Sequence, residues 1–266
     1  MAEESPFKAT SMDQLEFKFV HSGSPDIDLI RKYHATVIVP FFLPGEIEEV
    51  ELWEEHMRDP PPNPLCKWFL GVALDKTNGA VAGGGVFEYY YDSGCGLVPF
   101  VGIDVPYRGI SLATHILTQG KEFMVKLTQE MNISPPNALF MEILQVREED
   151  AVAKEASGFD AATRQKIWTK IGFQPLKDFD LVHPGRLKGK RYHLAPYVGP
   201  PTKDPSTGAT VFPHHPPFPV EVLLRFLKDE FTGIMLDEGS DSTEDYEAYE
   251  KQLQGQETLE VGQFWR

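Results

Sequence analysis

The chain has 266 residues, of which 41% are hydrophobic, and its formal net charge at pH 7 is −15. A chain of this length can bury one large core or two modest ones, so we expect a globular protein. The negative charge disfavours sequence-independent binding to nucleic acid and to anionic membranes, while it tolerates cationic small molecules. The two cysteines, Cys66 and Cys95, are too few for a disulfide framework and lack the spacing of a zinc site.

The two ends of the chain are polar. Residues 1–14 hold no apolar stretch like that of a signal peptide, and no run elsewhere has the length of a membrane span. We therefore expect a flexible arm over 1–14 on a cytoplasmic protein. Residues 236–260 hold nine acids and one base, a net charge of −8, which predicts a poorly ordered tail over 236–266. The main domain is predicted over 15–200, with a proline-rich segment and a helix over 201–235 packing on it.

The first hundred residues predict two helices and a series of strands. A helix is predicted from near Asp26, and another over 46–59 has acids in its first turn. Asn78-Gly79 is typical of a two-residue turn that joins neighbouring strands into an antiparallel hairpin. Apolar or alternating runs predict four strands, over 15–21, 67–75, 80–92 and 98–105.

The stretch from Leu97 to Leu117 joins an apolar strand to a helix through a tight turn. The first turn of a helix leaves amide N–H groups unpaired and carries the positive end of the helix dipole, so an anion can lie there. Small residues at Gly109, Ser111 and Ala113 let a phosphate approach the backbone. Arg108 adds a charge-assisted donor. The stretch predicts a phosphate site, and the alternative is an ordinary strand-to-helix turn without a ligand.

The rest of the sheet follows from the second half of the chain. A helix is predicted over 111–130, and the buried strand over 138–146 comes after this crossover, which favours parallel pairing with 98–105. A helix over 161–170 ends near Gly172, which fits a C-cap. Short strands complete the sheet over 173–176 and 190–194. The predicted fold class is α/β (α+β), a mixed and mostly antiparallel sheet with a central parallel pair and helices on both faces.

In this order, the elements and motifs resemble the GCN5-related N-acetyltransferase (GNAT) superfamily over about residues 15–200. The turn of that family, Gln/Arg-x-x-Gly-x-Gly/Ala, lies here on Arg108 to Ala113, with Ser111 where the family usually has glycine. A second family feature, a helix that closes on aromatic-x-x-x-Gly-Phe, matches Trp168 to Phe173.

The resemblance implies acetyl-CoA as the acyl donor and implies no metal. The pyrophosphate would rest on the amides of the turn. The pantetheine arm would run along the strand edge from Gly102 to Val105, where two parallel strands splay apart. The residues implied to bind acetyl-CoA are Ile103, Asp104, Val105, Arg108, Gly109, Ile110, Ser111, Leu112 and Ala113.

Acyl transfer to an amine needs a base, stabilisation of the oxyanion and a proton for the leaving thiolate. Glu88 and Glu142 each interrupt an apolar strand, and a buried Glu is disfavoured unless it is paired or functional. Both are candidate bases, and the alternatives are a solvent-facing strand residue and a structural ion pair. Trp168 stands where family members often have a tyrosine acid, so Tyr197 is the candidate acid, with Tyr192 as a substitute. The thiolate could also leave as such.

The resemblance implies an N-acetyltransferase that acetylates the primary amine of a small cationic molecule by direct transfer. Its partners would be acetyl-CoA and the amine, with no nucleic acid and no membrane, and the protein would be a monomer or a homodimer. Two alternatives stay open, a non-catalytic acetyl-CoA-binding sensor or interaction module, and a protein N-acetyltransferase. His214 and His215 are adjacent on an extended segment and point to opposite sides, so a loop is predicted there instead of a metal site.

Overall fold

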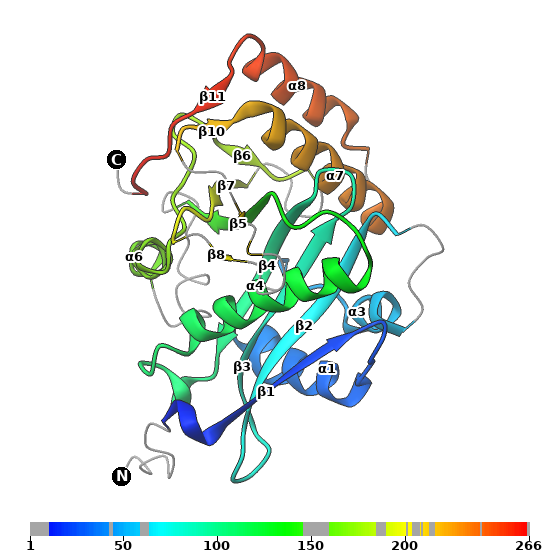
Figure 1. Ribbon diagram of the computed structural model, residues 1–266, viewed down its shortest axis with the longest axis vertical. Coiled ribbons are helices and arrows are strands. Elements are labelled where there is room, and N and C mark those ends of the chain that lie inside the picture. Colours follow the sequence, from blue (N-terminus) through cyan, green and yellow to red (C-terminus); the bar gives the residue numbers. More distant parts are fainter. Residues whose placement is uncertain are drawn as a thin grey trace. The chain divides into compact units, whose positions relative to one another are not determined.

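The structure is a computed structural model, shown in Figure 1, and it describes residues 11–42, 45–58, 64–145, 160–184, 190–200, 202–203, 208, 210–212, 216–239 and 241–264. They fall into two compact units. The first unit comprises residues up to 64, 68–87 and 99–123, and the second comprises residues 65–67, 88–98 and those from 124 onward. Three predicted features lie outside the described residues, namely the arm over 1–10, the loop over 147–159 and the pair His214 and His215. Among the described helices, none combines the length and the apolar character that crossing a membrane requires.

Seven strands form one mixed sheet in the order β1-β2-β3-β4-β5-β7-β6. Their bounds are Leu15–His21 (β1), Cys66–Asp75 (β2), Val81–Tyr90 (β3), Cys95–Ile103 (β4), Ala138–Leu144 (β5), Leu181–Val182 (β6) and Arg191–Pro196 (β7). β1 is antiparallel to β2, and β7 is antiparallel to both β5 and β6. β4 and β5 are parallel. The predicted mixed sheet with a central parallel pair is confirmed.

The parallel pairing lies nearer the start of β4 than the sequence predicts. The prediction paired 138–146 with 98–105, whereas the register runs from Cys95 with Ala138 to Leu97 with Phe140. Pro99 follows in β4, and a proline has no N–H to donate to a ladder. On its other edge β5 pairs with β7 along its length, with Glu142 opposite Leu194.

The helical segments of the first unit include α1 (Ile27–Tyr33), the π-helical η2 (His34–Ile38), α2 (Val39–Phe41), α3 (Val50–Arg58), the 3-10 turns η1 (Met12–Gln14) and η3 (Val105–Tyr107), and the first part of α4 (Leu112–Glu130). Trp68 and Phe69 are neighbours on β2, so they point to opposite faces of the sheet. Phe123 of α4 lies edge-on to Phe69, with ring centroids 5.2 Å apart. Trp53 of α3 is completely buried, 6.5 Å from Trp68. α4 and α3 therefore cover opposite faces of this part of the sheet.

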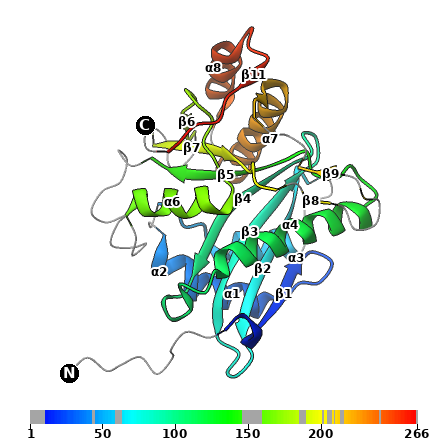
Figure 2. The same ribbon diagram turned by 60° about the vertical axis from the view of Figure 1, so that its left-hand side comes forward.

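In the second unit, α7 (Val220–Glu238) covers one face of the sheet. Its Phe226 stacks on Phe140 of β5 at 4.3 Å and lies edge-on to Tyr90 of β3 at 5.7 Å. These rings belong to a buried cluster that also includes residues of β7 and α8. α8 (Thr243–Leu253) lies beside α7 in both ribbon views (Figures 1 and 2). α6 (Ala161–Ile171) ends at Gly172, whose φ of +121° fits the predicted C-cap.

The acidic segment after residue 235 contains a packed helix, which differs from the poor order expected of it. α8 buries Tyr249 and Leu253. The Tyr249 hydroxyl accepts a hydrogen bond from the Val182 N–H at 2.6 Å and lies 3.2 Å from the Asp180 carbonyl. An apolar stripe of this kind fixes a helix while its acids face water, so local charge alone is a poor guide here. Two short ribbons pair β8 (Thr202–Lys203) with β9 (Thr210–Val211) and β10 (Phe218–Pro219) with β11 (Thr258–Leu259).

Candidate functional site

The turn between β4 and α4 has the open backbone that an anion site needs. Gly109 and Ser111 have φ values of +89° and +62°, in the left-handed region that favours glycine. Both residues are exposed, and a Cβ built on Gly109 would meet nothing within 4 Å. Ser111 therefore adopts the conformation that the family turn gives to glycine.

The first amides of α4 point toward this turn. His115 N–H donates to the Ser111 carbonyl at 3.2 Å, which is the first hydrogen bond of the helix. By the geometry of an α-helix, the N–H groups of residues 112–114 have no carbonyl of the same helix to bind. Leu112 is buried and anchors the helix start, whereas Ile110 and Ala113 are half-buried. The turn thus combines unpaired amides with the positive end of a 19-residue helix.

Arg108 is held in place beside the turn. Its Nε donates to the Ile103 carbonyl at 3.0 Å, and its guanidinium lies 4.7 Å from the centroid of the Phe41 ring. Ile103 is the last residue of β4, and Asp104 accepts a hydrogen bond from the Val105 N–H at 2.8 Å. Arg108 therefore ties the end of the strand to the turn, a role that the sequence did not indicate.

A second anchor joins η3 to the β2–β3 hairpin. Tyr107 Oη donates to Asp75 Oδ2 at 2.9 Å. Asp75 Oδ1 accepts from the Thr77 N–H at 2.8 Å and from the Thr77 hydroxyl at 2.6 Å. The hydrogen bonds from Thr77, followed by the one from Tyr107, hold the pKa of Asp75 below its usual value. The turn is therefore fixed from both sides.

In the second unit, Glu88, Glu142 and Glu230 of α7 lie together, and we name them the carboxylate cluster. Alternate residues of a strand share a face, so Glu88 lies on the face of Tyr90 and Glu142 on the face of Phe140, the face that α7 covers. Glu88 is 6% exposed and Glu230 is 3% exposed, whereas Glu142 is half-buried. Among the described residues, Oε1 of Glu142 and Oε2 of Glu230 are buried atoms without a hydrogen-bond partner.

The electrostatics of the carboxylate cluster follow from its burial. Burial raises the pKa of Glu230 well above its usual value, and the neighbouring Glu142 and Glu88 raise it further. Tyr90 Oη donates to Glu88 Oε2 at 2.5 Å. Burial, then the charge of Glu88, raises the pKa of Tyr90 well above its usual value. At neutral pH, Glu230 therefore holds a proton and Tyr90 is a neutral donor.

Tyr197, the predicted acid, lies elsewhere in the second unit. Leu194 is the register partner of Glu142, so Pro196 shares that face and Tyr197, one residue later, points to the other. Its ring meets Phe173 edge-on at 5.5 Å, just after α6. Burial raises the pKa of Tyr197. The structure brings the two predicted bases together and places Tyr197 on the opposite side of the sheet, while the substitute Tyr192 is buried in the core beneath α7.

Glu230 was missed from the sequence. It occupies a position of the apolar stripe of α7, at helical spacing from Leu223, Phe226 and Leu227. An acid in the middle of such a stripe is the signal that could have identified it, because an acidic side chain there must be buried.

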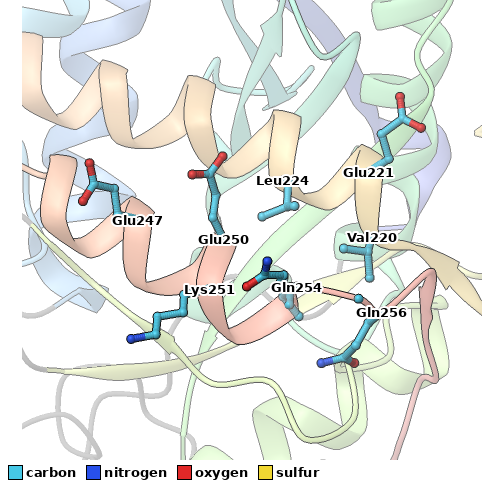
Figure 3. Close-up of a pocket in the computed structure, with 10 residues that line it drawn as sticks. Val220, Glu221, Leu224, Glu247, Glu250, Lys251, Gln254 and Gln256 are labelled. Atoms are coloured by element: carbon cyan, nitrogen blue, oxygen red, sulfur yellow. The ribbon is translucent and has the colours of Figure 1, made fainter.

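A groove of about 600 Å³ lies between α7 and α8 (Figure 3). Val220 and Leu224 supply apolar contacts, and Glu221 and Glu250 stand at its rim. Six residues separate Leu224 from Glu230, so the two lie about 120° apart around the helix axis. The groove is therefore on a different side of α7 from the carboxylate cluster. Within the part of the chain that the structure describes, no group of three or more His, Cys, Asp or Glu residues is arranged to hold a metal ion.

Comparison with known proteins finds likeness in fold. No family model and no curated protein matches the sequence. The chain is similar to a protein from Desulfovibrio desulfuricans described as an acetyltransferase of the GNAT family, with 16% identity, a TM-score of 0.46, and 68% of this chain and 97% of that chain covered. It is also similar to the ribosomal-protein-S5-alanine acetyltransferase of Vibrio fischeri, at 13% identity and a TM-score of 0.44, with 71% and 94% covered. A third similar structure is NAA60 of Arabidopsis thaliana with a bisubstrate analogue, at 11% identity and a TM-score of 0.43, with 69% and 97% covered.

Proposed function

We propose that the chain is an acetyl-CoA-dependent N-acetyltransferase that transfers the acetyl group directly to the primary amine of a small cationic molecule. The observation that carries the proposal is the turn at Gly109 and Ser111, where two positive φ values and the open start of α4 form a site for a pyrophosphate. The matching motif from Arg108 to Ala113 supports the same assignment.

On the donor side, the amides of residues 109–113 bind the pyrophosphate, and the backbone of Ile103, Asp104 and Val105 binds the pantetheine arm. Val105 is 59% exposed, so its surroundings leave room for a ligand. Gly102, just before this segment, accepts no side chain, because a Cβ there would lie 2.2 Å from Val37 Cγ1. The backbone conformation of this segment is therefore fixed before acetyl-CoA arrives, which lowers the entropy cost of binding.

On the acceptor side, the carboxylate cluster attracts a cationic amine. The free Oε1 of Glu142 accepts a proton from the ammonium group, and the neutral nitrogen attacks the thioester carbonyl. The C–N bond forms, the tetrahedral intermediate collapses, and the C–S bond breaks to release the thiolate of CoA. Tyr197 is the proposed donor of the proton that the thiolate takes up. A base and an acid can act from different faces of the sheet, because the amine nitrogen and the sulfur exchange protons at different atoms.

The proposal is tested by incubating the protein with acetyl-CoA and a panel of amines, from monoamines to polyamines and basic peptides, while free thiol is measured. We expect thiol release that depends on a small cationic amine and a product heavier by one acetyl group. The control is Glu142→Gln, which keeps the size of the side chain and removes the base. Thiol release that is unchanged in this variant would contradict the assignment of Glu142.

A second candidate function is a non-catalytic acetyl-CoA-binding module. Trp168 in place of a tyrosine and the position of Tyr197 away from the carboxylate cluster favour it. The same experiment separates the two functions, since a binding module gives a measurable dissociation constant for acetyl-CoA and releases no thiol with any amine. A protein N-acetyltransferase would instead acetylate the basic peptides and leave the small amines unchanged.

A further inference from the structure

Glu230 lies outside the part of the chain that resembles the acetyltransferase family. It belongs to α7, which begins at Val220, after the resemblance has ended near residue 200. Its side chain is 3% exposed and shares the sheet-facing side of α7 with Leu223 and Phe226. A carboxyl group at this depth costs folding free energy unless it is neutral or hydrogen-bonded.

The groups that face Glu230 come from three packed elements. They are Glu88 and Tyr90 on β3, Glu142 on β5 and Tyr249 on α8. Cys66 on β2 faces Tyr90 in turn. The interactions that act on Glu230 come from the two other carboxylates of the cluster, and both disfavour its charge. The negative charge that Glu230 would carry is therefore opposed by every one of these interactions.

Two carboxyl groups in contact inside a protein cannot both be ionised, so Glu142 and Glu230 share a proton. Glu230 is the more deeply buried of the two and keeps it. Its hydroxyl then donates to the ionised Glu142, the side-chain hydrogen bond that joins the pair. Oε1 of Glu142 stays without a partner, so one oxygen of this carboxylate is fixed and the other is available.

We propose that Glu230 is a positioning residue of the acceptor site, a neutral carboxyl that holds Glu142 ionised and oriented toward the amine. The role rests on the proposed function of Glu142 as base. A donated hydrogen bond stabilises the ionised form of the carboxylate that receives it. Without this donor, Glu142 binds a proton more readily in its buried site, and the enzyme loses activity at a higher pH than the native protein does.

The test compares two substitutions at one position. Glu230→Gln keeps an N–H donor for Glu142, while Glu230→Leu removes the donor and keeps an apolar volume. We expect the acid limb of the pH profile of kcat/KM to move up by about one pH unit in Glu230→Leu, a tenfold change in proton affinity, and to stay in place in Glu230→Gln. The KM for acetyl-CoA stays unchanged in both. Glu221→Leu is the matched control on the same helix, since the Glu221 side chain is 84% exposed, and its profile stays native.

Infrared difference spectra between the native protein and Glu230→Gln at pH 7 measure the shared proton directly, whether or not the leucine variant folds. We expect a protonated carboxyl band that is lost in Glu230→Gln. The absence of this band in the native protein would overturn the proposal, as would equal acid limbs in the native, Gln and Leu proteins. If the band is present but no amine is acetylated, the proposed function fails and the positioning role fails with it, while the shared proton stands as measured.

Discussion

Gly109 gives the sharpest test of the anion site, because its conformation resists a side chain and its surroundings do not. Its φ is +89°, and a Cβ built on it would meet nothing within 4 Å. Valine is strongly disfavoured at such a φ. Gly109→Val therefore drives the backbone toward negative φ and turns the amides of residues 109–111 away from the ligand.

The magnitude follows from the hydrogen bonds that this turn loses. A non-glycine residue in the left-handed region costs about 1–2 kcal/mol, which is small beside the about 5–15 kcal/mol that unfolds a typical protein. The variant is therefore expected to stay folded. A hydrogen bond to a charged group contributes about 1.5–3 kcal/mol, and about 1.4 kcal/mol is tenfold in a dissociation constant. Loss of one amide-to-phosphate hydrogen bond thus raises the Kd for acetyl-CoA about tenfold or more.

The assay is titration calorimetry with acetyl-CoA, accompanied by urea unfolding. Gly255→Val is the matched control, because Gly255 has a φ of +81°, is equally open and follows α8 in the other unit. We expect both variants to lose similar stability and Gly109→Val alone to lose affinity. A native Kd in Gly109→Val, with the stability loss present, would remove the turn from the acetyl-CoA site.

Three further changes probe the turn and the acid. Ser111→Gly should leave the Kd for acetyl-CoA within about twofold, since the backbone makes the contact, and an increase of about tenfold would instead show that the hydroxyl binds phosphate. Tyr107→Phe should lower the free energy of unfolding by about 1 kcal/mol at pH 7. Because the pKa of Asp75 is lowered in the folded chain, this loss should shrink as the pH falls below about 4, and urea unfolding at pH 3 and 7 measures it. Tyr197→Phe should lower kcat by about tenfold or more with native acetyl-CoA binding, and full turnover would reject Tyr197 as the acid.

The strand, turn and helix around Gly109 could be predicted because local signals coincide there. Pro106 and Gly109 interrupt an apolar strand, and helical spacing begins at Leu112. The positive φ of Ser111 could not be predicted, since serine has no preference for that conformation and the surrounding anchors impose it. Arg108 was expected to face a ligand, and its hydrogen bond to Ile103 depends on how the turn folds back on the strand.

The carboxylate cluster shows where sequence reasoning stops. Glu88 and Glu142 were selected one at a time, as acids in apolar strands. Their proximity depends on the sheet register and on α7, which brings in Glu230 from far along the chain. The tail was mispredicted for a related reason, because its net charge concealed the apolar contacts of Tyr249 and Leu253 with the rest of the unit. Local composition predicts elements well, and it carries little information on which side chains meet.

The pH dependence of stability gives a test of Glu230 that needs no activity. Its pKa in the folded chain is raised by burial and then by Glu142 and Glu88, whereas an unfolded glutamate titrates near about 4.3. Above that pH the unfolded chain has released a proton that the folded chain keeps, so the free energy of unfolding falls by up to about 1.4 kcal/mol per pH unit. Glu230→Gln removes this decline, and its stability relative to the native protein should rise from pH 5 to pH 8 in urea unfolding. Glu221→Gln, an exposed change on the same helix, should keep the native slope, and equal slopes in all three proteins would show that Glu230 is ionised in the fold.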